Sequence, residues 1–257
     1  MPDIGGILLN LPSVLVILAR LGGFFATAPI FSSRYIPVQV KTCLVLYLSC
    51  ALAPVVSIQP VDGVMRLAGV MFVEVLVGMA AGYVASLIFL AVQVAGQVAD
   101  QEMGFGMVNV FDPMHGNPIP LMGSFLYLLA LMLYLAIDGH HFLVASLIRS
   151  YERIPAGQIA GAHKMAEMVL ARMQGAFVLG VQIISPVLVA LFLATVAMGI
   201  MARTVPQINV FIMGLPVKVL VGASVVCLSL PVFTSVCINM FQSSFVWLSQ
   251  FLELIAP

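Results

Sequence analysis

The sequence predicts an all-α integral membrane protein, with about six long hydrophobic helices arranged as hairpins in a single domain over residues 1–257. Two features of the composition predict this class. Hydrophobic residues make up 62% of the chain, and mean hydropathy is +1.16. Charged residues make up only 8%, whereas soluble domains carry about 25%. A third feature is the length of the apolar runs, several of which reach the roughly 20 residues that a helix needs to span a bilayer.

Three hydrophobic helices are predicted in the N-terminal half. The first covers residues 4–30 and is interrupted by Arg20. The second covers the uncharged residues 42–61. The third covers residues 67–99 and carries Glu74. This third run is longer than a single span requires, so we expect a long helix that leads into the centre of the chain.

Three more helices are predicted in the C-terminal half, at residues 119–137, 173–202 and 219–252. Residues 149–172 lie between the first two of these and form the most polar part of the chain. Residues 203–218 form a connector between the last two. Its polar groups need hydrogen-bond partners in such an apolar setting, which predicts a turn in contact with other parts of the protein. The candidate turn and subunit-contact residues are Arg203, Pro206, Gln207, Asn209, Pro216 and Lys218.

The distribution of basic residues gives no orientation for these helices in a membrane. If connections alternate sides, Arg34, Lys41, Arg203 and Lys218 stand against Arg66, Arg149, Arg153, Lys164 and Arg172. The positive-inside rule therefore does not decide between the two orientations. One explanation is chance variation in the charge count. The other, which the failure favours, is that these helices are hairpins packed against partner subunits and not conventional membrane spans.

Residues 94–112 are the most unusual stretch. Polar side chains enter it from a hydrophobic helix, a glycine-rich apolar tip follows, and Asp112-Pro113 closes it. Irregular backbone and carboxylates are tolerated at membrane depth only when they are buried in protein or line an aqueous path. We therefore place this segment at a channel constriction. The candidate gating residues are Met103, Gly104, Phe105, Gly106, Met107 and Phe111.

Polar side chains within the apolar runs are candidate functional groups because they are costly at membrane depth. They are Glu74, Gln97, Asp100, Glu102, Asp138 and His140. For Glu74 a structural ion pair, or a hydrogen bond to a neighbour, fits equally well, since Arg66 lies about two helical turns earlier in the sequence. Gly78 and Gly82 follow Glu74 at the small-xxx-small spacing that lets two helices approach closely.

The sequence lacks the common enzyme and metal signatures, namely GxSxG, HExxH, a Walker loop and a dinucleotide fingerprint. His140 and His141 are adjacent, so a helix is expected to point them in different directions, and we expect no metal site there. Asp138 with His140 fits a proton relay, although a polar helix end turned by Gly139 fits better. We expect no catalytic residue and no cofactor.

The remaining composition excludes other partners. Ten basic and ten acidic residues give a net charge of zero, so no nucleic-acid partner is expected. The four cysteines all lie in apolar runs without CxxC spacing, and we expect them to be small core residues. They are Cys43, Cys50, Cys227 and Cys237.

A set of short motifs resembles the FliR family of flagellar type III export-gate proteins, which are related to injectisome subunits. The motifs run almost end to end and are specific in their order across six hydrophobic segments. They are Arg20 to Phe25 with Ala28-Pro29, Ile36-Pro37, Glu74 with Gly78 and Gly82, Ala95 to Gln97 through Met103 to Phe105, Asp112-Pro113, Asp138-Gly139-His140, Ser150 with Ile154-Pro155, and Arg203 to Phe211 with Gly214 to Lys218. The Asp-Gly-His element resembles the flagellar branch more than the injectisome branch.

The resemblance implies a non-enzymatic subunit of an export channel in the bacterial inner membrane, at the flagellar basal body. Its implied partners are FliP-like and FliQ-like subunits, an FlhB-like protein, and the unfolded flagellar polypeptides that pass through the channel. Residues 1–172 would correspond to a FliP-like part and residues 173–257 to a FliQ-like hairpin. Residues 103–111 would correspond to the plug of the channel, since Met and Phe side chains exclude water from a narrow pore.

Two other functions fit the residues. A proton-coupled or small-solute transporter would use Glu74, Asp100, Glu102 and Asp138 as carriers of charge. An intramembrane enzyme would use His140 and Asp138.

Overall fold

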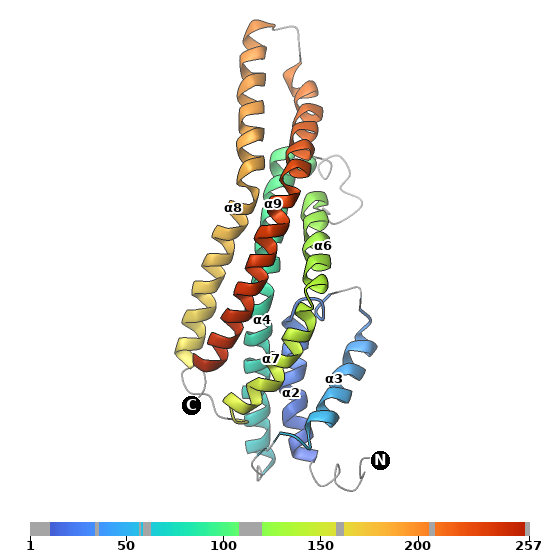
Figure 1. The fold of residues 1–257 in the computed structure, drawn as a ribbon, viewed down its shortest axis with the longest axis vertical. Coiled ribbons are helices and arrows are strands. Elements are labelled where there is room, and N and C mark those ends of the chain that lie inside the picture. Colours follow the sequence, from blue (N-terminus) through green and yellow to red (C-terminus); the bar gives the residue numbers. More distant parts are fainter. Residues whose placement is uncertain are drawn as a thin grey trace. The chain divides into compact units, whose positions relative to one another are not determined.

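The computed structural model describes residues 11–33, 36–56, 58, 63–107, 120–157, 162–205 and 209–254. All regular structure in these residues is helical, which confirms the predicted all-α class (Figure 1). The helices are α2 (Leu11–Thr27), α3 (Val38–Leu52), α4 (Val64–Met103), α6 (Leu121–Ala136), α7 (Gly139–Arg153), α8 (Ala162–Thr204) and α9 (Val210–Leu254), with the short 3-10 helix η1 at Phe105–Met107.

Three helices, α4, α8 and α9, are long and apolar enough to cross a membrane. A fourth span is formed if α6 and α7, which are separated by Ile137 and Asp138, count as one broken span. The helices α2 and α3 have 17 and 15 residues, fewer than the roughly 20 that a span requires. The membrane class is therefore confirmed, with helices of more unequal length than predicted.

The second predicted helix, residues 42–61, is shorter than expected because α3 ends at Leu52. Pro54 follows two residues later, and a proline after the last helical residue cannot continue the hydrogen-bond ladder.

The last two helices extend further than predicted. α8 begins at Ala162, so the polar residues before Met173 form its first turns rather than a loop. α9 begins at Val210 and contains Pro216, so the prediction that the connector reaches Lys218 is wrong. In apolar surroundings a helix is the simplest way to satisfy backbone N–H and C=O groups, and here it continues through a proline.

The described helices form two compact units. One consists of residues 1–87, 138–173 and 241–257, and the other of residues 88–137 and 174–240. The predicted division of the chain after residue 172 is a separate proposal about family parts and stays a prediction.

In the first unit, α2 packs directly against α4 at two glycines. A Cβ atom added at Gly78 would overlap the backbone of Arg20, and one added at Gly82 would overlap Thr27 and the backbone of Phe24. The predicted small-xxx-small contact is therefore confirmed, with α2 as the partner helix.

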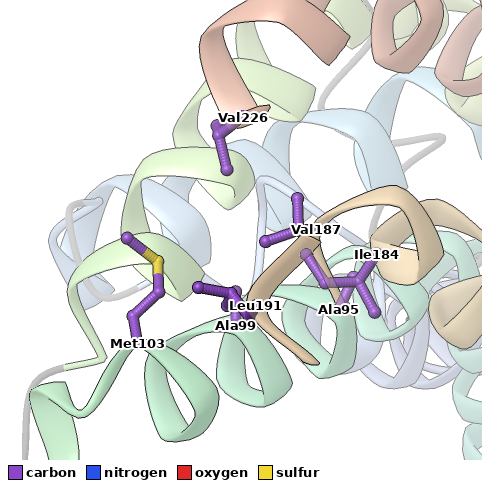
Figure 2. Packing of buried hydrophobic residues seen from close by; sticks show 7 residues of the cluster. All are labelled: Ala95, Ala99, Met103, Ile184, Val187, Leu191 and Val226. Atoms are coloured by element: carbon purple, nitrogen blue, oxygen red, sulfur yellow. The ribbon is translucent and has the colours of Figure 1, made fainter. Parts of the chain in front are cut away.

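In the second unit, buried apolar side chains from α4, α8 and α9 form a core that we call the Met103 cluster (Figure 2). Its residues are Ala95, Ala99, Met103, Ile184, Val187, Leu191 and Val226. Residues spaced four apart lie on one face of a helix. Ala95, Ala99 and Met103 therefore form the face of α4 that packs in this core.

The cysteine prediction is wrong for three of the four residues. Cys237 is buried, whereas Cys43, Cys50 and Cys227 are exposed on their helices. The reason is that apolar helix faces are not all covered within a single chain of a membrane protein. All four cysteines are free.

Candidate functional site

Arg20 of α2 is fully buried and pairs with Glu74 of α4. Nε of Arg20 donates to Oε2 of Glu74 at 2.5 Å, and Nη2 donates to Oε1 at 3.1 Å. The relative exposures of the two side chains are 0% and 1%. This two-point geometry matches the guanidinium fork to the carboxylate. The ion-pair interpretation of Glu74 is thus confirmed, but its partner is Arg20 and not the exposed Arg66.

The pair is surrounded by further polar contacts from α7 and the residues after it. Arg20 donates through Nη1 to Oγ of Ser150 at 3.1 Å and through Nη2 to the carbonyl of Ile154 at 3.0 Å. Its guanidinium carbon lies 4.2 Å from the centre of the Tyr151 ring. The amide of Gly157 donates to Oε1 of Glu74 at 2.9 Å. We call these six residues the Arg20 network.

The Arg20 network ties three helices to one another. Two charges removed from water are tolerated only when their remaining polar atoms are also hydrogen-bonded, and here both members have further partners. Gly157 has φ +77° and lies against Val70, so a larger residue would be strained and would crowd α4. The network is therefore a specific clamp that holds the helices of the first unit together.

Asp100 of α4 caps the start of α6 in the second unit. Its two carboxylate oxygens accept the amide hydrogens of Met122 at 2.8 Å and Gly123 at 3.0 Å. The residue at the usual capping position is Pro120, which makes no side-chain capping bond. Asp100 thus satisfies donors at a helix start that lacks its own cap and places a negative charge at the positive end of α6.

Gln97 and Glu102 lie on the same helix as Asp100, and both are exposed. Of these three candidate residues, Asp100 is therefore engaged within the chain, whereas Gln97 and Glu102 face outward. A Cβ at Gly96 would overlap Gly123, so α4 and the start of α6 are in direct contact beside Asp100.

The predicted gating segment begins in the Met103 cluster. Met103 is fully buried and Phe105 packs partly against the cluster. Between them, Gly104 has φ +87°, and a Cβ there would overlap the side chain of Leu215. Gly106 is exposed, and Met107 ends η1. Phe111 lies outside the described residues, and the gating role of the segment stays a prediction.

Asp138 and the two histidines after it lie at the start of α7. Asp138 has a left-handed backbone, with φ 56°, and its Oδ1 lies 3.5 Å from Nδ1 of His141. The rings of His140 and His141 lie with their centres 4.2 Å apart. The prediction that they point in different directions is therefore wrong. Side chains at a helix start lean back toward the N-terminus, which lets two adjacent rings meet.

The connector residues have mixed outcomes. Arg203 is exposed in the last turn of α8. Asn209 caps the start of α9. Its Oδ1 accepts the amide hydrogen of Ile212 at 3.3 Å, as the side chain of an N-cap residue does. Pro216 and Lys218 lie within α9 and not in a turn. Pro206 and Gln207 lie outside the described residues.

Sequence reasoning missed Arg20 as a site residue and treated it as an interruption of an apolar run and as part of a family motif. The signal was present, because a charged residue inside such a run needs a partner at the same depth. Ser150 belonged to a family motif, but nothing in the sequence linked it to Arg20. Gly157 carried no signal, since glycines are common in turns of membrane proteins.

Comparison with known proteins identifies the family. The model of a family described as "Bacterial export proteins, family 1" matches residues 11–244. The flagellar biosynthetic protein FliR of Bacillus subtilis strain 168 is 33% identical over 251 residues, covering 95% of this chain and 96% of that protein. FliR of Aquifex aeolicus is 29% identical, covering 91% of each chain. FliR of Escherichia coli K12 is 28% identical, covering 89% of this chain and 88% of that protein. The family model and the match to the Bacillus subtilis protein both span nearly the whole length of this chain. The chain therefore belongs to the FliR family of flagellar export proteins.

Proposed function

We propose that this chain is a core subunit of the flagellar type III export gate in the bacterial inner membrane. With FliP-like and FliQ-like subunits, and beside an FlhB-like protein, it forms the channel through which unfolded flagellar polypeptides leave the cell interior. Its role in this proposal is structural and non-enzymatic. Family membership and the membrane-type helices support this role.

The observation that carries the proposal is the exposure of the two longest helices. Only 17% of the most apolar part of α8 and of α9 is buried, compared with 61% for α4. Exposed apolar surface of this extent is covered either by lipid or by other proteins.

The length of these helices favours protein over lipid as part of the cover. Residues 173–202 of α8 are uncharged, and at about 1.5 Å per residue they measure roughly 45 Å. A hydrocarbon core of about 30 Å, crossed at an average tilt of about 20°, covers only part of that length. The rest needs apolar partners, as in a subunit whose helices pack beside those of neighbouring subunits.

The plug is proposed for residues 104–111, with Met103 as its anchor. Met103 holds one end in the Met103 cluster, and Gly104 supplies the left-handed turn that leads out of α4. Met107 and Phe111 are then the apolar side chains that seal the pore by excluding water. Such a seal does not recognise sequence, which suits a channel for unfolded polypeptides of many kinds.

The outward-facing polar residues are proposed to contact neighbouring subunits. Gln97 and Glu102 are exposed on α4, and Arg203 and Asn209 are exposed at the junction of α8 and α9. Polar groups of this kind hydrogen-bond across helices in membranes. A transporter function fits less well, because Glu74 and Asp100 are already engaged within the chain and would have to break these contacts to carry charge.

The subunit proposal is tested by co-expressing the chain, carrying an affinity tag, with FliP-like and FliQ-like subunits and measuring the masses of the purified particles in mild detergent by native mass spectrometry. A discrete hetero-oligomer is expected. A stable monomer or homodimer that retains no partner would overturn the proposal and favour the transporter.

The plug is tested separately, in the assembled complex, by deleting residues 104–110. The expected result is an intact complex that conducts ions across planar bilayers, because most of the plug, including Met107, is gone while the Met103 cluster remains. The matched control is Gly106→Ala, an exposed position where an added Cβ meets no other atom within 4 Å, and it should not leak. An assembled deletion variant with unchanged conductance would contradict the plug.

A further inference from the structure

The start of α7 carries three metal-ligating side chains that the export role does not use. They are Asp138, His140 and His141, and one ligand atom from each lies within 4.8 Å of the other two. These are a carboxylate and two imidazoles, the ligand types that proteins use for zinc and related first-row metals. We call these three residues the Asp138 triad.

One distance within the triad is close to that of a metal centre, and all three ligand atoms lie within 4.8 Å of one another. Ligands about 2.0–2.1 Å from a tetrahedral zinc ion lie roughly 3.3 Å from one another. Oδ1 of Asp138 and Nδ1 of His141 are 3.5 Å apart. These two side chains are 72% and 76% exposed, so small rotations that complete the geometry would disturb no packing.

The side chains are not committed to other partners in the described part of the chain. Asp138 stands at the N-cap position of α7 but makes no capping hydrogen bond with its side chain, although capping is the usual reason for an aspartate there. Nδ1 of His140 is shielded from solvent and has no hydrogen-bond partner among the described residues. A shielded polar nitrogen without a partner calls for an explanation, and a bound metal ion would supply one.

The local charge sets the character of such a site. The positive end of α7 opposes a cation, and the Asp138 carboxylate offsets it, since the first turn of α7 holds no other acidic residue. Three protein ligands leave the fourth position to water, unlike the four protein ligands of a closed structural zinc site. The triad therefore fits an ion that binds reversibly and keeps a water ligand.

We propose that Asp138, His140 and His141 form a three-ligand site for a first-row divalent cation such as Zn²⁺, with water completing the coordination. This reverses the expectation of no metal at this position, because that expectation rested on the two rings pointing apart.

The test is a titration of the full-length chain in detergent with Zn²⁺ by calorimetry and with Co²⁺ by visible absorption, after treatment with a chelator. The purification tag must contain no histidine. One equivalent of metal is expected, with the intense visible bands of tetrahedral cobalt. Replacing a ligand, His141→Ala or Asp138→Asn, should weaken binding at least about tenfold, since even changes to outer partners of a metal ligand cost 10–100-fold.

Asp138→Asn guards the test against misfolding, because asparagine also tolerates the left-handed backbone of this position. The matched control is His163→Ala. His163 and Glu167 form an exposed pair on α8, 3.5 Å apart, which offers two ligands rather than three. Equal binding by wild type, His141→Ala and Asp138→Asn would overturn the proposal, as would loss of binding in His163→Ala alone.

Discussion

The Arg20 network and the Met103 cluster both hold α4 to neighbouring helices, but by different kinds of contact. The first uses directional hydrogen bonds around a buried charge pair, and each atom has a defined partner. The second uses apolar side chains around a methionine, whose flexible thioether adapts to irregular spaces. A satisfied polar network specifies one arrangement, whereas apolar packing tolerates related arrangements of similar volume.

This difference fits different roles for the two halves of α4 in the proposed export gate. The half of the helix that carries Glu74 would be a fixed frame, since any displacement separates charges that are out of reach of water. The half that ends in Met103 leads directly into Gly104 and the proposed plug. A packed but adaptable anchor lets that segment move without unfolding its helix.

The largest effect is expected from breaking the Arg20 network. Arg20→Leu leaves the Glu74 carboxylate buried without a counter-charge, which destabilises a protein by about 3–5 kcal/mol. We expect a large drop in the thermal unfolding temperature of the detergent-solubilised chain. Unfolding is measured by the fluorescence of Trp247, the single tryptophan. Arg20→Lys should also be strongly destabilising, because an ammonium group cannot replace the fork.

Two controls separate the network from a general effect of charge. Arg66→Leu removes an exposed arginine from the same unit and should change stability by no more than about 0.5 kcal/mol. The double variant Arg20→Leu with Glu74→Leu removes both charges and should recover much of the loss. A double variant as unstable as Arg20→Leu alone would show that the ion pair is not the main source of the effect.

A smaller effect is expected in the Met103 cluster. Met103→Ala removes a fully buried side chain and should cost about 2–3 kcal/mol, within the range for large-to-small core changes. Met103→Leu conserves volume and should cost less than about 1.5 kcal/mol. Chemical denaturation in detergent measures both, with the exposed Met132 changed to alanine as a control. If Met103→Leu were as harmful as Arg20→Lys, the contrast between specific and adaptable packing would be wrong.

The two regions also differ in how far they could be predicted from sequence. The long helices α4, α8 and α9 followed from the lengths of the apolar runs, although α7 was not predicted. The contact at Gly78 and Gly82 followed from their spacing. These signals are local, since a helix and its faces are set by residues within a few turns. The order of short motifs resembled the FliR family, and the comparisons confirmed that membership.

The Arg20 network was out of reach because its members are distant in sequence. Glu74 lies 54 residues from Arg20, and Ser150 lies 130 residues from it. Proximity in the sequence pointed to Arg66 as the ion-pair partner of Glu74, but the side chain of Arg66 is exposed. The pairing is decided by tertiary packing of α2 on α4, and a sequence without structure gives no measure of that packing. The helical course through Pro216 was missed for a related reason, since the apolar surroundings outweigh the local preference of proline.

The smallest of the expected effects concerns Asp100, a polar contact within the otherwise apolar second unit. Asp100→Asn keeps an acceptor for the start of α6 but removes its negative charge, which should cost about 1 kcal/mol. Hydrogen exchange should quicken at the amides of Met122 and Gly123, the two that donate hydrogen bonds to Asp100.

The matched control is Glu102→Gln, which removes the same charge from an exposed side chain two residues further along α4. Quickened exchange in Asp100→Asn alone would assign the effect to the cap, and equal quickening in both would assign it to net charge. A loss for Asp100→Asn larger than that for Met103→Ala would mean that the second unit also depends chiefly on a directional polar contact, and α4 would then be fixed along both of its halves.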